Sequence, residues 1–383
     1  MAGRTQAALY DELDLELSWS EAELPQAQRT KHVHALHPYL GKYVPQLVEV
    51  FLERFVEPGG RVLDPFSGSG TTLVEANVFG CAAVGCDISA FNCLLARVKT
   101  RPHDLEQLQR DLDRALERAL ETSPGTAGAS DWLQLWYAPR ALAELLAYRE
   151  QVNALPSGSR DVAQIVLSRS ARSARLTTHF DLDFPKEPTR GAYQCYKHKR
   201  ICRPVGEAAK FLRRYSSDTL ARLREYDTLR TDCDIDVIHG DTRRLRTSDR
   251  FHAVVTSPPY PGLIDYHEQH RYAYELLGFE DRRQEEIGAA AGGRTKASLA
   301  RYADGMVAAF EASARHLEPS APVVIVVNDT HDVYPAILER AGLDLVERRR
   351  RHVNRRTGRR SGEYYEHVLV CRAQSPRVVA ASA

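Results

Sequence analysis

The chain has 383 residues, of which 43% are hydrophobic and 27% are charged, and its formal net charge is +1. This length exceeds one ordinary compact domain, so we expect a main domain with a large insertion or a second lobe. No apolar run is long enough to span a bilayer, and no secretory leader is recognisable at the N-terminus. These features exclude a membrane partner and predict a soluble, cytoplasmic protein.

The first 100 residues contain the strongest secondary-structure signals. Residues 1–30 form an acidic arm, with six Asp and Glu against two Arg, and without periodicity we expect weak order there. Apolar residues over 47–55 recur at helical spacing, and a Pro-Gly-Gly break follows. Next come a strand at 61–64, a glycine-rich turn, a helix at 71–79 and a strand at 82–86. This order predicts a βαβ unit.

The central region, residues 101–230, is predicted to be mostly helical. Leucines recur there at helical spacing, and strand signals nearly vanish. Within it, residues 165–215 contain twelve Lys and Arg against four Asp and Glu, interleaved with Tyr193, Tyr196, Phe211 and Tyr215. Bases and aromatic rings together suit contact with phosphates and stacking on nucleobases, although a solvated helix face has the same composition.

The seven cysteines are odd in number and widely spaced, so they do not predict a disulfide framework. Cys195 and Cys202, with His198 between them, are compatible with metal binding. No second ligand pair follows nearby at the usual spacing, however, and we therefore expect no metal site.

Strand signals resume after residue 230. Apolar runs at 235–238, 253–256 and 323–327 are nearly continuous, as in parallel strands that are buried on both faces. Two further runs, 343–346 and 367–370, predict a hairpin that closes the sheet at its edge. An arginine cluster lies between them, from Arg348 to Arg360, and is interpreted either as a solubilising surface or as a phosphate contact.

The turn after the first strand reads Asp64-Pro65-Phe66-Ser67-Gly68-Ser69-Gly70-Thr71-Thr72. Glycines between a strand and a helix allow a ligand to approach the backbone and the helix N-terminus, which favours a nucleotide-like cofactor. Asp87 ends the next strand, 17 residues after Gly70, where a carboxylate can accept both ribose hydroxyls of an adenosine. The same Asp can also cap the helix that follows.

A second motif, Ser257-Pro258-Pro259-Tyr260, directly follows the strand at 253–256. Consecutive prolines cannot continue a parallel ladder, and their restricted backbone holds neighbouring carbonyls and the Ser257 hydroxyl in one orientation. Such acceptors suit an NH₂ group, and the ring of Tyr260 offers a flat surface on which a base can stack.

With both motifs intact, the chain resembles the DNA amino-methyltransferases over about 31–100 and 231–330. The resemblance implies an α/β, Rossmann-like class I methyltransferase fold, with a mostly parallel central sheet, a closing β-hairpin and a large helical insertion. It implies S-adenosylmethionine as cofactor, with Tyr43 near the methionine end and Asp241 at the adenine amino group. The implied cofactor residues are Tyr43, Asp64, Phe66, Ser67, Gly68, Gly70, Thr71, Thr72, Asp87, Ile88 and Asp241.

The resemblance also implies methyl transfer to an exocyclic amine, with Ser257, Pro258, Pro259 and Tyr260 as the catalytic residues. Ser at the first position favours cytosine N4, whereas Asp there favours adenine N6. No Pro-Cys dipeptide is present, so the nucleophile of ring-carbon methylation is missing. The base would have to leave the duplex to react. The alternatives are an adenine-N6 enzyme, an RNA amino-methyltransferase, or a DNA-binding subunit with a vestigial cofactor pocket.

The domain boundaries follow from these assignments. Residues 31–100 and 231–372 are expected to form the catalytic domain, 101–230 the target-recognition region, and 373–383 a disordered tail, with 261–300 contributing a mobile segment. The expected partner is double-stranded DNA, which would place the protein on the nucleoid, and a homodimer and a cognate restriction endonuclease are further candidates. The residues expected to contact DNA are Arg169, Arg172, Lys197, Lys199 and Arg200.

Overall fold

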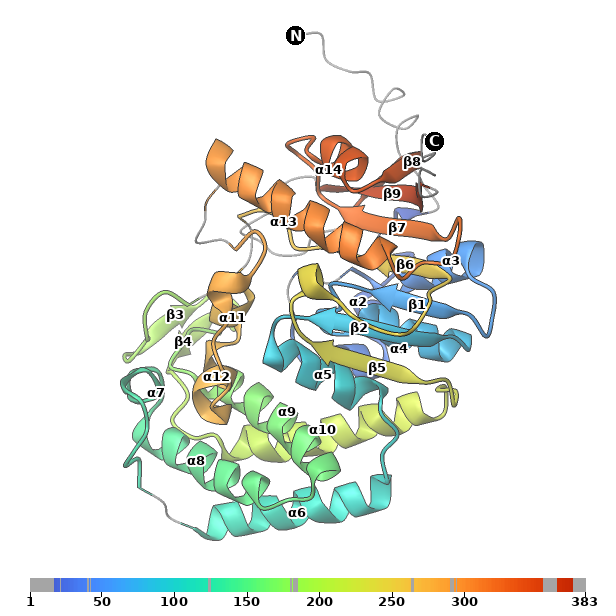
Figure 1. Cartoon of the computed structure of the whole chain (residues 1–383). Coiled ribbons are helices and arrows are strands. Elements are labelled where there is room, and N and C mark those ends of the chain that lie inside the picture. Colours follow the sequence, from blue (N-terminus) through green and yellow to red (C-terminus); the bar gives the residue numbers. More distant parts are fainter. Residues whose placement is uncertain are drawn as a thin grey trace, which may run out of the picture.

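The computed structural model of the protein describes residues 17–374 except 21, 40, 42, 123–124, 180, 182–184, 263–264, 290–292, 294 and 354–363. Its centre is a seven-stranded sheet in the order β5-β2-β1-β6-β7-β9-β8 (Figure 1). The strands of this sheet are β1 (Arg61–Asp64), β2 (Ala82–Asp87), β5 (Ile235–His239), β6 (Ala253–Thr256), β7 (Pro322–Val327), β8 (Leu343–His352) and β9 (Tyr365–Ala373).

Strand directions confirm the predicted α/β, Rossmann-like class. The pairs β1–β2, β1–β6, β2–β5 and β6–β7 are parallel, whereas β9 is antiparallel to both β7 and β8. The predicted closing hairpin is therefore β8–β9, and β8 is the edge strand. Strand β1 pairs with β2 on one side and with β6 on the other. Ligands of open α/β sheets bind at such a switch point, outside the carboxyl ends of the strands.

Alternating side chains give the sheet two apolar faces, because neighbouring residues of a strand point to opposite sides. Val62 packs with Leu47 and Phe51 of helix α3 (Pro45–Phe55), whereas Leu63 packs in the cluster that contains Phe310 of α13 (Lys296–Ala314). The other helices near the sheet are α4 (Thr71–Phe79), α5 (Ala90–Thr100) and α14 (Tyr334–Arg340). Both faces are thus covered, which explains the nearly continuous apolar strands.

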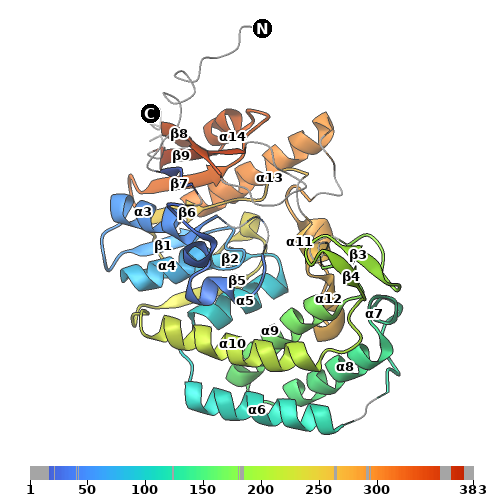
Figure 2. The same ribbon diagram turned by 180° about the vertical axis from the view of Figure 1, so that it is seen from behind.

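Residues 101–230, inserted between β2 and β5, have a helical core that continues onto α5. Leu112, Leu145 and Val166 of this region belong to one buried cluster with Phe91 and Leu95 of α5. Figures 1 and 2 show these helices packed together below α5. The insertion contains α6 (Leu105–Glu121), α7 (Asp131–Trp136), α8 (Pro139–Asn153), α9 (Ser157–Ala174) and α10 (Ala209–Asp227).

The region is mostly helical, as predicted, and residues 101–230 also contain a two-stranded antiparallel sheet that was not predicted. It consists of β3 (Tyr193–Cys195) and β4 (Arg200–Cys202). Each strand is only three residues long and carries few large apolar side chains, so periodicity did not reveal it. Figures 1 and 2 place this hairpin beside helix α11 (Tyr266–Gln269), which is followed by α12 (Arg271–Leu277).

The chain ends are only partly described. Leu17 is buried in the core, and Ser18 accepts a hydrogen bond from the main-chain N–H of His352, so this part of the acidic arm packs on the closing hairpin. Ala373 still belongs to β9, and Gln374 donates to Asp344, which moves the start of the predicted tail; residues 375–383 lie outside the described part. The short helices are α2 (Gln26–Arg29), η2 (His32–Ala35), η3 (Thr242–Arg244) and η4 (Arg283–Glu285).

No helix in the described part of the chain combines the length and the apolar character needed to cross a membrane.

Candidate active site

A cavity opens at the carboxyl ends of β1, β2 and β6, at the switch point of the sheet. Its empty volume, which includes the solvent at its mouth, is about 780 Å³. Eight predicted cofactor residues line it, together with Ser257 and Pro259 of the predicted catalytic motif. The eight are Tyr43, Phe66, Ser67, Gly68, Thr71, Asp87, Ile88 and Asp241.

Asp87 is held by a network of donors at the end of β2. Its carboxylate accepts hydrogen bonds from the main-chain N–H of Gly68 (2.9 Å), the main-chain N–H of Ser89 (2.8 Å) and the side-chain amide of Asn92 (3.1 Å). Burial raises the pKa of Asp87 to about 6, although the three hydrogen bonds act in the opposite direction. The helix that follows is capped by Ser89, whose hydroxyl accepts from the Asn92 main-chain N–H, and not by Asp87 as expected.

The glycines of the turn have different tasks. Gly68 has φ +48°, and a Cβ atom there would lie 2.9 Å from the Tyr39 hydroxyl, so a side chain would strain the backbone and crowd the cavity wall. Gly70 has φ +78° and lies against Ala96 of α5, where a Cβ would be 3.0 Å from the Ala96 methyl. Gly70 therefore allows the close packing of α4 and α5. It was predicted to contact the cofactor, but it does not line the cavity.

Two more predicted cofactor residues act behind the cavity wall. Asp64 accepts from the Thr256 hydroxyl (2.7 Å) and from the Phe66 main-chain N–H (3.1 Å), and burial raises its pKa to about 6. Thr72 donates to the Val255 carbonyl and also bonds to Tyr43. Both connect β1 and α4 to β6, so they hold the turn in position without facing the cavity.

The Ser-Pro-Pro-Tyr loop is anchored at several points. Thr256, directly before it, is bonded to Asp64; the Tyr302 hydroxyl donates to the Pro259 carbonyl at 3.0 Å; and the Tyr260 hydroxyl donates to Glu366 at 2.9 Å. Ser257 and Pro259 line the cavity, whereas Pro258 and Tyr260 do not. The loop thus presents its first residue to the cavity, while the ring of Tyr260 packs against the apolar cluster around α13 and β7.

Sequence reasoning missed several residues of the cavity, most of them from outside the two motifs. Tyr39 stacks on Tyr266 with ring centroids 5.7 Å apart, and Asn92 donates to its hydroxyl at 3.2 Å. Tyr39 lies within residues 31–100, over which the chain resembles the family, and this resemblance was the signal that could have identified it. Tyr266, together with Glu285, Glu286 and Ile287, comes from the segment 261–300, which was expected to serve DNA recognition.

The lining suits S-adenosylmethionine. The buried side-chain oxygens of Ser67, Ser69 and Thr71 have no hydrogen-bond partner within the described protein, and the same is true of Asn92 Oδ1. Buried polar atoms are normally paired, so these atoms suit a polar ligand with donors and acceptors of its own. Glu286 also lines the cavity, and its unpaired Oε2 would complement a positively charged group of such a ligand.

Asp241 and Ile88 also line this cavity. The carboxylate of Asp241 accepts from the Arg243 main-chain N–H (3.0 Å) and guanidinium (2.9 Å). Desolvation raises the pKa of Asp241, but the hydrogen bonds from Arg243 outweigh it, and the net direction is downward. Asp241 is therefore an ionised acceptor that a ligand amino group would share with Arg243.

The five predicted DNA contacts separate into two groups. Lys197, Lys199 and Arg200 are all exposed on the β3–β4 hairpin. Arg169 is 7% exposed, forms an ion pair with Asp218 at 2.7 Å and stacks over a tyrosine ring. Its assignment as a phosphate contact is corrected, because its charge is already paired inside the insertion. Arg172, on the same helix, is half-buried.

The second basic cluster is also largely engaged where the structure describes it. Arg351 is 3% exposed and pairs with Glu366 at 3.2 Å. Arg348 pairs with Asp332 at 2.9 Å, and Arg350 stacks over Tyr365. These arginines stabilise the closing hairpin. The remaining part of the cluster, from 354 to 360, lies outside the described residues.

Comparison with known proteins identifies the family of the chain. Residues 11–97 match the family model described as DNA methylase. The Type II methyltransferase M.MjaII from Methanocaldococcus jannaschii is 34% identical over 94% of this chain and 84% of its own length. The Type II methyltransferase M.MvaI from Kocuria varians is 38% identical over 20% of this chain and 18% of its own.

Solved structures resemble the chain at lower identity. The rRNA methyltransferase aviRa from Streptomyces viridochromogenes is 14% identical, with a TM-score of 0.35, over 92% of this chain and 95% of its own. TrmN from Thermus thermophilus is 14% identical, with a TM-score of 0.34, over 87% of this chain and 50% of its own. The identity to M.MjaII along nearly the whole chain, together with the two motifs at one cavity, shows that the chain belongs to the S-adenosylmethionine-dependent DNA amino-methyltransferases.

Proposed function

We propose that the chain methylates the N4 amino group of cytosine at a specific site in double-stranded DNA. The observation that carries this choice is Ser257, which lies at the cavity wall in the first position of the Ser-Pro-Pro-Tyr loop. Ser in that position favours cytosine by resemblance to the family, whereas Asp favours adenine. The neutral hydroxyl of Ser257 is small, so it leaves room for a base amino group beside the cofactor.

The anchored loop supports catalysis by orientation. An exocyclic amine is a poor nucleophile, because its lone pair is delocalised into the ring. Acceptors at the Ser257 hydroxyl and the Pro258 carbonyl would draw the two amino hydrogens toward a tetrahedral arrangement and free the lone pair. The bond from Tyr302 to the Pro259 carbonyl and the bond from Tyr260 to Glu366 already hold this loop, so little rearrangement is needed. The cofactor supplies the electrophilic methyl group.

In this proposal Tyr260 has less freedom to stack on the base than the sequence alone suggested. Its hydroxyl is bound to Glu366, and Glu366 is paired with Arg351, so the ring is tied to the closing hairpin. We propose that Tyr260 borders the space of the flipped base and keeps the two prolines in place. A base that leaves the duplex costs a few kcal/mol, which contacts of this kind would offset.

The insertion, residues 101–230, is proposed as the target-recognition region. Its hairpin exposes Lys197, Lys199 and Arg200, and it lies beside α11, whose first residue Tyr266 lines the cofactor cavity. Cations near the mouth of the cavity would hold the phosphates that flank the reacting base. Because M.MjaII is described as a Type II methyltransferase, we also propose a restriction endonuclease of the same specificity as the cellular partner.

The proposal is tested by nucleoside mass spectrometry of DNA from a host that expresses the chain, with base-resolution mapping of the modified site. N4-methylcytosine at one sequence context, absent from a host that expresses the Ser257→Ala variant, is the expected result. Detection of N6-methyladenine would contradict the choice of cytosine as the target base, but it would be consistent with the proposed orientation of the amine. 5-Methylcytosine, or methyl groups found only in RNA, would contradict the proposal.

A further inference from the structure

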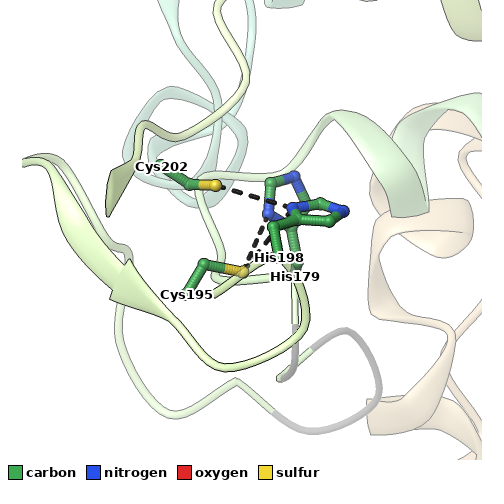
Figure 3. A group of neighbouring side chains, drawn as sticks. All are labelled: His179, Cys195, His198 and Cys202. Carbon is green, nitrogen blue, oxygen red and sulfur yellow. Dashed lines mark hydrogen bonds between the residues drawn. The ribbon is translucent and has the colours of Figure 1, made fainter. Parts of the chain in front are cut away.

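Four side chains with metal-binding atoms meet at the β3–β4 hairpin. They are His179, Cys195, His198 and Cys202, and their ligand atoms all lie within 4.8 Å of one another (Figure 3). Cys195 ends β3, Cys202 ends β4, and His198 is in the turn between them. His179 comes from the segment after α9, so the fourth ligand reaches the hairpin from outside it.

The distances fit the edges of a coordination tetrahedron. Around tetrahedral zinc, bonds of about 2.3 Å to sulfur and about 2.0 Å to nitrogen place each sulfur about 3.5 Å from each nitrogen. Cys195 Sγ lies 3.6 Å from His179 Nδ1 and 3.7 Å from His198 Nδ1. Cys202 Sγ lies 3.5 Å from His198 Nδ1. Three sulfur–nitrogen edges therefore agree with a single ion between the two thiols and the two imidazoles.

Hydrogen bonding alone explains this arrangement poorly. A thiol is a weak donor, yet two sulfurs converge on Nδ1 of His198. The Tyr193 hydroxyl is 2.9 Å from His179 Nδ1 and also accepts from the His179 main-chain N–H at 3.0 Å. That main-chain bond would keep Tyr193 in place when the ring nitrogen binds a metal.

The hairpin also needs an additional source of stability. Its strands have three residues each, and an isolated two-stranded hairpin is marginally stable in water. Tyr196 and Ile201 point to solvent, with 79% and 69% of their surface exposed, whereas Cys195 and Cys202 are buried at 2% and 9%. The thiols thus occupy the interior positions that apolar side chains would fill in a larger sheet.

We propose that His179, Cys195, His198 and Cys202 bind a structural Zn²⁺ ion. Two thiolates and two imidazoles are a donor set that favours tetrahedral zinc, and four protein ligands leave no open position for a reacting water. The ion fixes the turn that exposes Lys197 and Lys199 and connects it to the segment after α9. The earlier expectation of no metal site rested on the missing second ligand pair; His179 was overlooked because it is 16 residues before Cys195.

A second group of potential ligands, His32, His34 and Glu75, does not compare with this site. Glu75 already accepts from Lys31 at 2.9 Å and is bonded to His34 at 2.6 Å. The charge of Glu75 is therefore balanced by protein groups. The group of three potential ligands also includes no thiol.

The test is metal analysis of the purified full-length chain by inductively coupled plasma mass spectrometry, combined with cobalt exchange. We expect about one zinc ion per chain, and a cobalt-exchanged protein with the visible absorption of tetrahedral thiolate-bound cobalt. Cys195→Ser and Cys202→Ser should each lose the metal and the cobalt signal, whereas Cys233→Ser, a half-buried thiol outside the cluster, should keep both. S-adenosylmethionine binding measured by calorimetry should persist in all three variants.

The wild-type measurements do not depend on whether a variant folds. A wild-type chain that is purified without stoichiometric zinc and gives no tetrahedral cobalt spectrum would overturn the proposal. So would a spectrum without sulfur-to-cobalt absorption, or full metal content in both cluster variants. Loss of metal in Cys233→Ser to the same degree would also overturn it.

Discussion

The main-chain N–H of Gly68 donates a hydrogen bond of 2.9 Å to Oδ2 of Asp87. This bond ties the turn after β1 to the end of β2, two neighbouring parallel strands. Because Gly68 occupies a left-handed conformation and Asp87 is also held by Ser89 and Asn92, the two cofactor-binding segments form one preorganised unit.

Asp87→Ala should weaken S-adenosylmethionine binding by roughly 10- to 100-fold, since hydrogen bonds to a charged group contribute about 1.5–3 kcal/mol. The variant loses the acceptor for the ribose hydroxyls and releases the Gly68 N–H. Calorimetry measures the affinity. Asp232→Ala, which removes a fully exposed carboxylate before the start of β5, is the matched control and should bind normally. Equal affinity in a folded Asp87→Ala variant would remove Asp87 from the site.

Cofactor affinity should fall as the pH drops through about 6. Burial raises the pKa of Asp87 to about 6, so the carboxyl is protonated below that pH and is a poorer acceptor for the ribose hydroxyls. The ligand favours the ionised form, so its affinity is fully present above pH 6 and is lost below it. Calorimetry over about pH 5–8 follows the change, because this range brackets a pKa of about 6.

A second carboxyl, that of Asp64, titrates in the same pH range as Asp87, so the experiment needs a control that separates the two. Burial raises the pKa of Asp64 to about 6 as well, but its carboxylate is bonded to Thr256 and Phe66 behind the cavity wall. Asp87→Asn removes one of these titrations and keeps the other. A pH dependence that persists unchanged in this variant would assign the effect to Asp64.

Ser257→Ala should lower turnover by roughly 10²-fold, as expected for the loss of one oriented polar group that acts mainly in the transition state. Affinities for DNA and cofactor should change little. Tyr260→Phe is the comparison variant: it loses the bond to Glu366 but keeps the ring, and it should lower turnover much less than Ser257→Ala, because the bond from Tyr302 to the Pro259 carbonyl still holds the loop. Transfer of labelled methyl to duplex DNA measures both. Wild-type turnover in Ser257→Ala would refute the proposed role.

Replacing Lys197, Lys199 and Arg200 together by Ala should weaken DNA binding and flatten its salt dependence. Each lost phosphate contact lowers the slope of log K against log salt by about 0.9. Fluorescence anisotropy at several salt concentrations measures the slope, while calorimetry should show unchanged cofactor binding. The control variant replaces Arg110, Arg114 and Arg118 of α6 by Ala, so that both variants lose three positive charges and have the same net charge. If both variants changed the slope equally, the hairpin would have no specific part in DNA binding.

Arg169→Met should destabilise the fold by roughly 2 kcal/mol and leave the salt slope of DNA binding unchanged. The substitution breaks a buried ion pair with Asp218, and the expected loss is smaller than for a fully buried pair because Arg222 still bonds to Asp218. Urea unfolding followed by circular dichroism measures the change, with exposed Lys199→Met as the control. An unchanged unfolding midpoint combined with a flatter salt slope would restore Arg169 as a phosphate contact.

The sequence by itself determined the catalytic half of the molecule. Apolar runs such as 253–256 and 323–327 predicted buried parallel strands, and the strand–turn–helix from Arg61 to Phe79 is present with the expected bounds. These elements are encoded by local pattern, because burial on both faces requires continuous apolar residues and a cofactor turn requires glycine. The two motifs lie at one cavity, since the carboxyl ends of neighbouring parallel strands meet at the same edge.

Only the tertiary structure decided which side chains are free and which meet across the chain. Arg169 and Lys199 are both cations of one basic stretch, yet the first is paired inside a helical core and the second is exposed. Tyr266 reaches the cofactor cavity from a segment about 200 residues after the Gly68 turn. His179 reaches the β3–β4 hairpin from the segment that follows α9. Local composition contains no record of such contacts, because they depend on how whole helices pack against one another.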